Sequence, residues 1–185
     1  MCDGTDRSRW VPSLRRDAPA PSHAARVQHL PMTHAAPDGP RFSALSRDEC
    51  VALLSRHDVG RIAFTFQDRV DIQPINYVYD AGWLYGRTSE GTKLETIAHN
   101  RWVAFEVDEV RGPFDWVSVV VHGAFYRLDL EAPTPADRQA AAHAAGLLHN
   151  VVPNTFAMGD PVPWRTVLFR VHVDDITGRR AVPAG

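Results

Sequence analysis

Residues 70–93, "VDIQPINYVYDAGWLYGRTSEGTK", decide the fold class of this chain. Residues 70–80 and residues 83–89 are each predicted to form a strand. Ala81 and Gly82 lie between the two strands and predict a tight hairpin turn, so the strands pair antiparallel. The stretch therefore predicts antiparallel β structure in the middle of the chain.

The flanking sequence extends this antiparallel pattern in both directions. Four further segments alternate as half-buried strands do: residues 61–66, 102–110, 116–130 and 165–178. Three helices are predicted to begin near residues with capping or turn chemistry: Ser46, Thr92 and Thr134. Five or six antiparallel strands with few helices predict a mainly β protein, closed or nearly closed into a β-barrel.

Composition limits the class of protein and its partners. The 185 residues carry a net charge of −2, so a broad basic surface for nucleic acid is not expected. No apolar run is long enough to span a bilayer, and Cys2 and Cys50 form no disulfide framework, which predicts a cytoplasmic protein. Residues 1–40 lack an apolar period and predict a disordered or loosely docked extension. Residues 41–185 are predicted to form one domain.

The stretch that follows the hairpin has the composition of a phosphate site. Lys93 is the only lysine in the chain, and it lies after a strand end, in a turn that contains Gly91. Hydroxyls, free backbone N–H groups and two cations converge there, which is what a phosphate dianion requires. The residues involved are Arg87, Thr88, Ser89, Thr92 and Lys93. By itself, the same stretch is equally compatible with an ordinary helix start on the surface.

Pro74 is unusual within a predicted strand, because it donates no ladder hydrogen bond. Its presence indicates an edge strand, a bulge, or a place where the backbone faces a ligand in place of a neighbouring strand.

Four segments in order resemble the pyridoxamine 5'-phosphate oxidase-like flavoproteins, in particular their small nitroimidazole-resistance-like branch. They are "VGRIAF", "DIQPINYVYDAGWLYGRTSEGTKLETIAHNRWVAFEV", "WVSVVVHGAFYRL" and "DDITGRR". The similarity covers residues 44–180. It implies an antiparallel split β-barrel of the FMN-binding type that holds FMN at the interface of a homodimer. The activity implied is that of an FMN-dependent oxidoreductase acting on a small molecule.

The same resemblance assigns cofactor-binding residues in three groups. The positions that match the FMN phosphate grip are Arg87, Thr88, Thr92 and Lys93. The strand that matches the one along the flavin ring and ribityl chain contributes Pro74, Ile75, Asn76 and Tyr77. The later strand, matching the cofactor's edge, contributes Trp116 and Ser118. No catalytic side chain is expected, because the flavin carries the chemistry, and no metal ligand is expected, because no pair of histidines has the spacing of a zinc site.

Several alternatives stay open from the sequence. One is a flavin- or haem-binding protein without turnover, such as a carrier, store or sensor. Another is a deazaflavin-dependent reductase on the same fold, and FAD is an alternative to FMN. Arg170 and His172 have the Arg-x-His spacing of the vitamin-phosphate oxidases, but outward-facing polar residues of a strand explain that spacing more simply. The sequence specifies neither the substrate nor the electron donor.

Overall fold

A computed structural model describes residues 39–66, 69–91, 94, 97 and 99–184. Residues 1–38, which make up most of the predicted extension, lie outside the described residues, and so do Thr92 and Lys93 of the predicted phosphate site. The described residues belong to one compact unit, Thr33–Gly185. No helix in this described part is long and apolar enough to cross a membrane.

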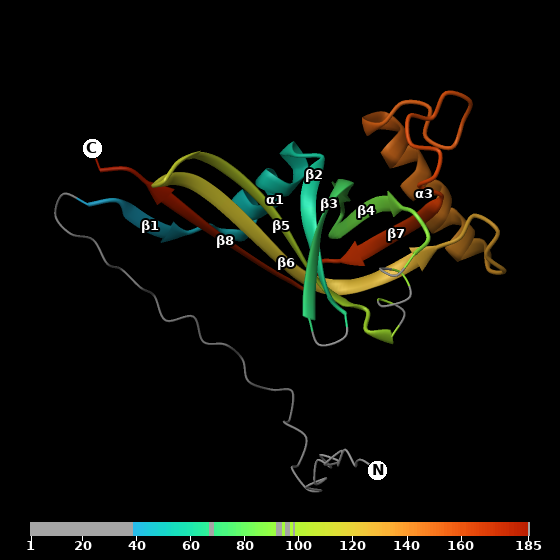
Figure 1. The fold of residues 1–185 in the computed structure, drawn as a ribbon, viewed down its shortest axis with the longest axis horizontal. Coiled ribbons are helices and arrows are strands. Elements are labelled where there is room, and N and C mark those ends of the chain that lie inside the picture. Colours follow the sequence, from blue (N-terminus) through green and yellow to red (C-terminus); the bar gives the residue numbers. More distant parts are fainter. Residues whose placement is uncertain (1–38, 67–68, 92–93, 95–96, 98, 185) are drawn as a thin grey trace, which may run out of the picture. The chain divides into compact units, whose positions relative to one another are not determined.

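Eight strands and two helices are defined within the described ranges (Figure 1). In chain order they are β1 (Arg41–Ala44), α1 (Arg47–Arg56), β2 (Val59–Phe66), β3 (Arg69–Asp80), β4 (Trp83–Thr88), β5 (Trp102–Gly112), β6 (Asp115–Leu128), α3 (Pro135–Val151), β7 (Val167–His172) and β8 (Asp175–Val182). Leu94, Ile97 and His99 are also helical, in the segment where a short helix is predicted. Every strand pair is antiparallel.

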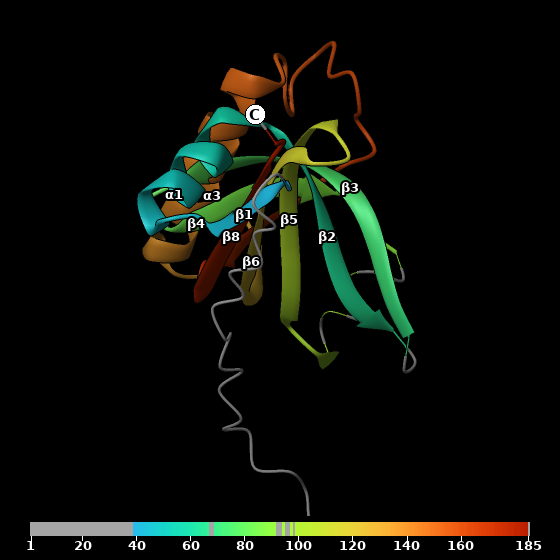
Figure 2. The same cartoon turned by 90° about the vertical axis from the view of Figure 1, so that its left-hand side faces the viewer.

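The strands close into a ring in the order β6–β5–β2–β3–β4–β7 and back to β6. β6 is long enough to change partners: Trp116–His122 pair with β8, and Phe125–Leu128 pair with β7. β8 and then β1 continue the sheet outside the ring. Figure 2 shows β5, β2 and β3 as neighbours on one side. The predicted antiparallel split β-barrel is therefore confirmed.

The prediction of a single last strand over residues 165–178 is wrong, because the segment forms β7 and β8. Between the pairs Phe125↔Val171 and His122↔Asp175, β6 advances by three residues and the opposing chain by four. The extra residue is a bulge that breaks the ladder. A Cβ on Gly123 would lie 1.7 Å from the carbonyl oxygen of His172, so the close approach of the two chains here requires glycine. Sequence alternation also missed the four-residue strand β1, whose residues are all exposed.

The main core fills the space between the sheet and α1. Alternate residues of β2, β5 and β6 point inward, among them Ile62, Phe105 and Val121. The capping box between Ser46 and Glu49 starts α1 as predicted. Cys50 follows it as a buried core residue, 1% exposed, and burial raises the pKa of its thiol.

A second, smaller apolar cluster attaches α3 to the barrel. Ala141, Ala144 and Leu148 form one buried face of α3. They pack against Tyr85 of β4 and Leu168 of β7. Thr134 caps this helix and Pro135 begins it, as predicted. α3 therefore holds β4 and β7 together, and the chain after α3 returns to the barrel beside them.

Candidate functional site

The candidate site lies where β3 and β4 separate. The two strands pair from the turn at Ala81–Gly82, where both residues have positive φ, as far as Tyr77 and Gly86. Beyond that point β3 continues beside β2, while Arg87–Thr88 of β4 pair with β7 (Figure 1). Among the described strands, the edge of β3 that faces this fork has no partner. Pro74 lies on that edge, so the prediction of an edge position is confirmed.

A cavity of about 410 Å³ opens in the fork. It is lined by three segments that are distant in sequence: residues 73–75 of β3, residues 87–91 at the end of β4, and Trp164–Arg165 after α3. Four of the predicted cofactor-binding residues meet here: Pro74, Ile75, Arg87 and Thr88.

Arg87 is buried in this cavity wall and is paired with a carboxylate. Its side chain is 3% exposed, and its two terminal nitrogens donate to the two oxygens of Asp160 at 2.5 and 2.8 Å. The Asp160 carboxylate, 5% exposed, also accepts the backbone N–H groups of Phe156 and Val162, each at 2.9 Å. The hydrogen bonds from Arg87 hold the pKa of Asp160 well below its usual value of 3.8. Any phosphate at Arg87 therefore competes with an internal carboxylate.

The loop after α3 is organised around this pair. The ring of Phe156 lies 5.3 Å from the guanidinium of Arg87, and backbone hydrogen bonds close successive turns between residues 154 and 165. At the end of the loop, Arg165 donates through Nη1 to Oδ1 of Asn76, at 3.2 Å. The loop thereby spans the fork from β4 to β3 and places Trp164 and Arg165 on the cavity.

The turn at the end of β4 presents backbone and hydroxyl groups to the same cavity. Thr88 is buried and Ser89 is half-buried. Gly91 has a φ of +147°, a conformation that side chains disfavour, although a Cβ there would meet nothing within 4 Å. The glycine is therefore required by the backbone and not by lack of space. Glu90, an exposed residue that also lines the cavity, pairs with Arg127.

Two residues predicted to lie along the ligand place their side chains in the core instead. Ile75 is 4% exposed and belongs to the main apolar cluster. Tyr77 is 1% exposed, its hydroxyl donates to the backbone carbonyl of Leu54 at 2.7 Å, and its ring meets Phe105 edge-on. Burial raises the pKa of this phenol. Asn76, the residue between them, faces the loop through Arg165.

Trp116 and Ser118 lie elsewhere in the protomer. Trp116 lines a second cavity, of about 460 Å³, between α1, the β5–β6 hairpin and β8. Ser118 donates to Oε1 of Glu106 at 2.9 Å. Glu106, in turn, pairs with Arg61, so this carboxylate already has two partners within the protein. Within one protomer, the structure does not bring Trp116 and Ser118 to the fork cavity.

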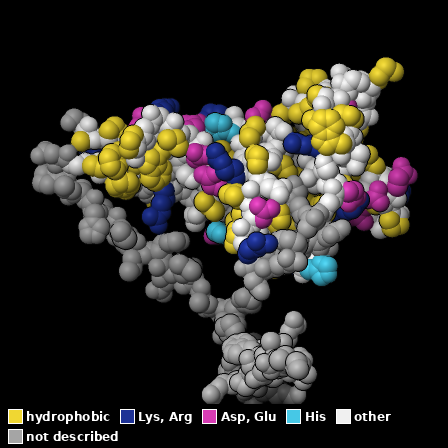
Figure 3. Space-filling model, viewed as in Figure 1, with side chains coloured by type: hydrophobic (Ala, Val, Ile, Leu, Met, Phe, Trp, Pro, Cys, Tyr) yellow, Lys and Arg dark blue, Asp and Glu magenta, His cyan; other side chains and the backbone are white. Residues whose placement is uncertain are grey.

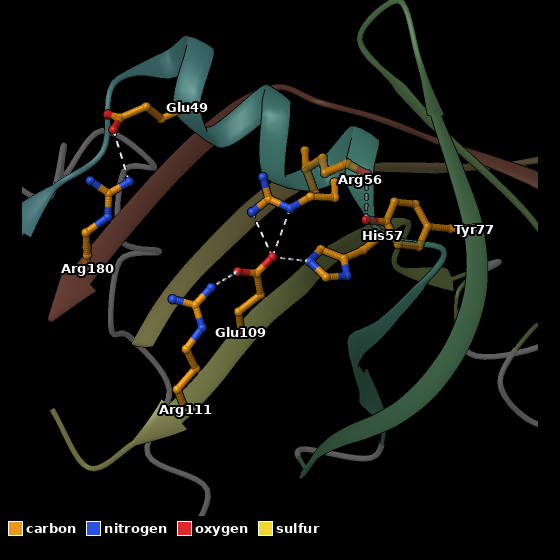
Figure 4. Close-up of polar contacts among 8 residues, drawn as sticks. Glu49, Arg56, His57, Tyr77, Glu109, Arg111 and Arg180 are labelled. Carbon is orange, nitrogen blue, oxygen red and sulfur yellow. Dashed lines mark hydrogen bonds and ion pairs between the residues drawn. The ribbon is translucent and has the colours of Figure 1, made fainter. Parts of the chain in front are cut away.

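A network of charged groups stands beside this second cavity (Figure 4). One oxygen of Glu109 accepts two hydrogen bonds from Arg56, at 2.7 and 2.9 Å, and lies 2.7 Å from Nε2 of His57. Arg111 approaches the other oxygen at 3.9 Å. The contacts from His57 first, and Arg56 second, lower the pKa of Glu109. The network ties the end of α1 to β5, which is a structural role.

Other candidate groups from the sequence have protein partners. Arg170 stacks on Trp83, 4.1 Å from its ring centroid, and His172 lies 2.7 Å from Asp174, so the Arg-x-His spacing serves the sheet surface. In the described part of the chain, no three His, Cys, Asp or Glu side chains gather as a metal site would require. Sequence reasoning missed Asp160 and Arg165, because the pairing of Arg87 with a residue 73 positions away has no local signal.

The fold and the fork cavity define a split β-barrel protein with a polar, cation-lined site between diverging strands. Residues 46–180 match the family model described as pyridoxamine 5'-phosphate oxidase. A curated, uncharacterised protein of Rhizobium meliloti (strain 1021) is 30% identical over 145 residues, which cover 74% of this chain and 93% of that protein. The chain therefore belongs to the pyridoxamine 5'-phosphate oxidase family, and the resemblance drawn from its sequence is confirmed.

Solved structures agree with this assignment. A FAD-binding protein from Mesorhizobium loti is 28% identical, with a TM-score of 0.62, and the match covers 78% of this chain and 99% of that one. The FAD-binding protein from Mycobacterium smegmatis is 33% identical, with a TM-score of 0.55 and coverage of 76% and 99%. A Bacteroides thetaiotaomicron protein, named for 5-nitroimidazole antibiotic resistance, is 17% identical with a TM-score of 0.56 and coverage of 76% and 88%, and shares the fold.

Proposed function

We propose that this protein is a flavin-dependent oxidoreductase that binds a flavin nucleotide in the fork cavity and acts on a small molecule at its open face. The observation that carries the proposal is the meeting of the β4 turn and the unpaired edge of β3 in one cavity of about 410 Å³. Support also comes from the Mesorhizobium loti and Mycobacterium smegmatis structures, both described as FAD-binding proteins.

The residues of the cavity fit the two ends of a flavin nucleotide. Thr88, Ser89 and the backbone at Gly91 offer hydroxyl and N–H donors for a phosphate. Pro74, exposed on the β3 edge, offers an apolar surface and a backbone without a strand partner on that side for the ring system. Lys93, which lies outside the described residues, stays the predicted point charge for the phosphate.

A bound flavin would supply hydride and electron transfer, so the side chains need only bind and orient it and leave one face open. The protein's part is the rigid fork. β3 is fixed by β2, β4 is fixed by β7, and the loop contact from Arg165 to Asn76 bridges the two arms. Such a preformed site reduces the conformational cost of binding.

A homodimer is part of the proposal, with Trp116 and Ser118 of each protomer serving the partner's flavin. Two observations support it. Neither residue lines the protomer's own fork cavity, and the Trp116 ring lies 6.2 Å from that of the exposed Phe42. Figure 3 shows the apolar side chains gathered at the end of the sheet formed by β1, β8 and the β5–β6 turn. Phe42 and Phe114 are 45% and 51% exposed there, with ring centroids 6.5 Å apart. A patch of this kind marks an interaction surface.

The test is the absorption spectrum of the purified protein, before and after addition of FMN or FAD and desalting. The proposal expects retained flavin bands and a flavin that NAD(P)H reduces and that a small-molecule acceptor reoxidises. Bound flavin that no donor or acceptor turns over would favour a carrier, store or sensor. A Soret band would favour haem, and a colourless protein that holds neither flavin would favour a deazaflavin or no cofactor.

A matched pair of variants tests the phosphate anchor. Lys93→Ala is expected to weaken flavin nucleotide binding by about 1.5–3 kcal/mol, the scale of a lost charge-assisted hydrogen bond. Arg138→Ala, which removes an exposed cation of α3 that lines neither cavity and lies outside the proposed interface patch, is expected to leave the dissociation constant unchanged. Equal dissociation constants for wild type and Lys93→Ala would contradict the assignment of Lys93. A cytoplasmic location, and the absence of nucleic-acid and membrane partners, stay predictions from composition.

A further inference from the structure

The charge balance of the fork cavity points to a second recognition element in the loop after α3. The guanidinium of Arg87 is held at both terminal nitrogens by the Asp160 carboxylate, and both side chains are at least nine-tenths buried. A bidentate pair of this kind is geometrically complete. Arg87 therefore contributes no free positive charge to the cavity. Of the described residues that line the cavity, Arg165 is the other cation.

Arg165 is placed to contact a ligand. It carries five N–H donors. The hydrogen bond from Nη1 to Asn76 directs the Arg165 side chain towards β3. The hydrogen bond from the backbone N–H of Arg165 to the carbonyl of Val162 holds its backbone in place. Arg165 and the Thr88–Gly91 turn come from separate segments that line the same cavity, so donors for an anion reach it from two parts of the chain. One phosphate needs only one of these groups of donors, whereas a diphosphate can engage both.

Trp164 adds an aromatic surface next to Arg165. Its indole is 62% exposed at the cavity although it is the largest apolar side chain of the loop. A planar base that leaves the cavity past Arg165 would stack on this indole, and such stacking is sequence-tolerant and substantial. An exposed tryptophan on a loop that is otherwise tightly hydrogen-bonded has no packing role among the described contacts.

We propose that Trp164 and Arg165 form a subsite for the adenosine diphosphate part of a flavin dinucleotide, so that the chain prefers FAD to FMN. Arg165 contacts the second phosphate and Trp164 stacks on adenine. Arg87 is a positioning residue that holds the loop through Asp160 and touches neither group. This inference rests on the proposed flavin site and specifies its ligand.

The loop is prepared for that role before any ligand binds. The Asp160 carboxylate accepts four hydrogen bonds, two from Arg87 and two from backbone N–H groups of the loop itself. Phe156 covers the guanidinium from one side. These contacts order the loop in advance, so binding of the adenosine part meets a preformed surface.

The experiment titrates flavin-free full-length protein with FAD, FMN, riboflavin and ADP. Wild type is expected to bind FAD at least about tenfold more tightly than FMN, and ADP is expected to compete with FAD. Trp164→Ala and Arg165→Gln should each reduce FAD affinity about tenfold while changing FMN and riboflavin affinity less than about threefold. Trp164→Phe, which keeps an aromatic face, should retain most of the preference for FAD.

Arg87→Lys distinguishes a positioning role from direct contact with the ligand. Lysine keeps the positive charge but cannot make the two parallel hydrogen bonds that the guanidinium makes to Asp160. If Arg87 acts through Asp160, this variant lowers the FAD-to-FMN affinity ratio. An equal loss for FMN and FAD, with riboflavin unchanged, would show that Arg87 itself binds the first phosphate and would overturn the positioning role. Equal losses for all flavins in Trp164→Ala and Arg165→Gln, or a wild type that binds FMN as tightly as FAD, would overturn the subsite. A wild type that binds no flavin at all would instead overturn the proposed function.

Discussion

Tyr77→Phe tests the reassignment of Tyr77 from the predicted ligand strand to the core. The substitution removes only the hydroxyl, because the ring keeps its edge-on contact with Phe105 at a centroid distance of 4.7 Å. The lost group is a buried hydrogen bond of 2.7 Å to the carbonyl of Leu54, near the end of α1. The expected result is a stability loss without a loss of flavin binding.

The magnitude follows from what the hydroxyl leaves behind. A typical intramolecular hydrogen bond contributes about 1 kcal/mol net, and a buried carbonyl without a partner costs more, so the free energy of unfolding should fall by about 1–2 kcal/mol. Burial raises the pKa of the phenol above its usual value of 10, so the hydroxyl keeps its proton and this contribution is fully present at pH 7. With a urea slope of about 2 kcal/mol/M, the midpoint should move down by about 0.5–1 M.

Urea unfolding followed by tryptophan fluorescence measures the stability, and a flavin titration of the same preparation measures the dissociation constant. Tyr126→Phe is the matched control, since Tyr126 is a half-exposed tyrosine of β6, 36% exposed, and its loss of a hydroxyl should change neither quantity. A Tyr77→Phe variant with wild-type stability and clearly weakened flavin binding would refute the placement of this side chain in the core.

Three further substitutions have expected outcomes. Gly91→Ala forces an alanine to a φ of +147° and should destabilise the protein by about 1–3 kcal/mol in thermal unfolding, whereas Gly112→Ala, with open space and no such φ, should not. Gly146→Ala, in the middle of α3 with nothing within 4 Å of the new methyl group, should stabilise it by up to about 1 kcal/mol. Glu109→Gln should lower the unfolding free energy at pH 7 by up to about 1 kcal/mol. Because its folded pKa is depressed, the Glu109 contribution is present above its usual value of 4.5 and is lost as the pH falls through the folded pKa, so the two unfolding curves should converge in acid. A gap that does not narrow as the pH falls below 4.5 would contradict this explanation.

Local signals were sufficient for most of the fold. Alternation located β2, β5 and β6, and the Ala81–Gly82 turn between two predicted strands gave the pairing of β3 with β4. The capping box at Ser46 started α1 where expected. β1 was not predicted, because its four residues are all exposed and show no alternation of apolar and polar side chains. The division between β7 and β8 escaped because it depends on the bulge opposite β6, which is a property of the paired strands and not of either strand alone.

The parts of the site formed by residues adjacent in sequence could be predicted, whereas the contacts between residues distant in sequence could not. The turn from Arg87 to Gly91 could be read from its hydroxyls, glycine and cation, because those groups are neighbours in the chain. The partner of Arg87 could not, since Asp160 comes from a loop that only α3 returns to the barrel. The side chain of Tyr77 lies in the core against α1, and a strand pattern by itself cannot distinguish a face that meets a ligand from a face that meets a helix.

The position of the cavity follows from where the pairing of β3 and β4 ends. β4 pairs with β7 along its whole length, Trp83–Thr88, but with β3 only from Trp83 to Gly86. The two strands part after Gly86, and the parting leaves one edge of β3 without hydrogen-bond partners among the described residues. An exposed strand edge invites aggregation unless something blocks or covers it. Pro74 blocks the ladder at one residue, and the loop held by Arg87 and Asp160 reaches across to Asn76 at another. What remains open between these two points is a backbone edge beside a polar turn, which is the part of the barrel that a planar ligand with a phosphate group can complete.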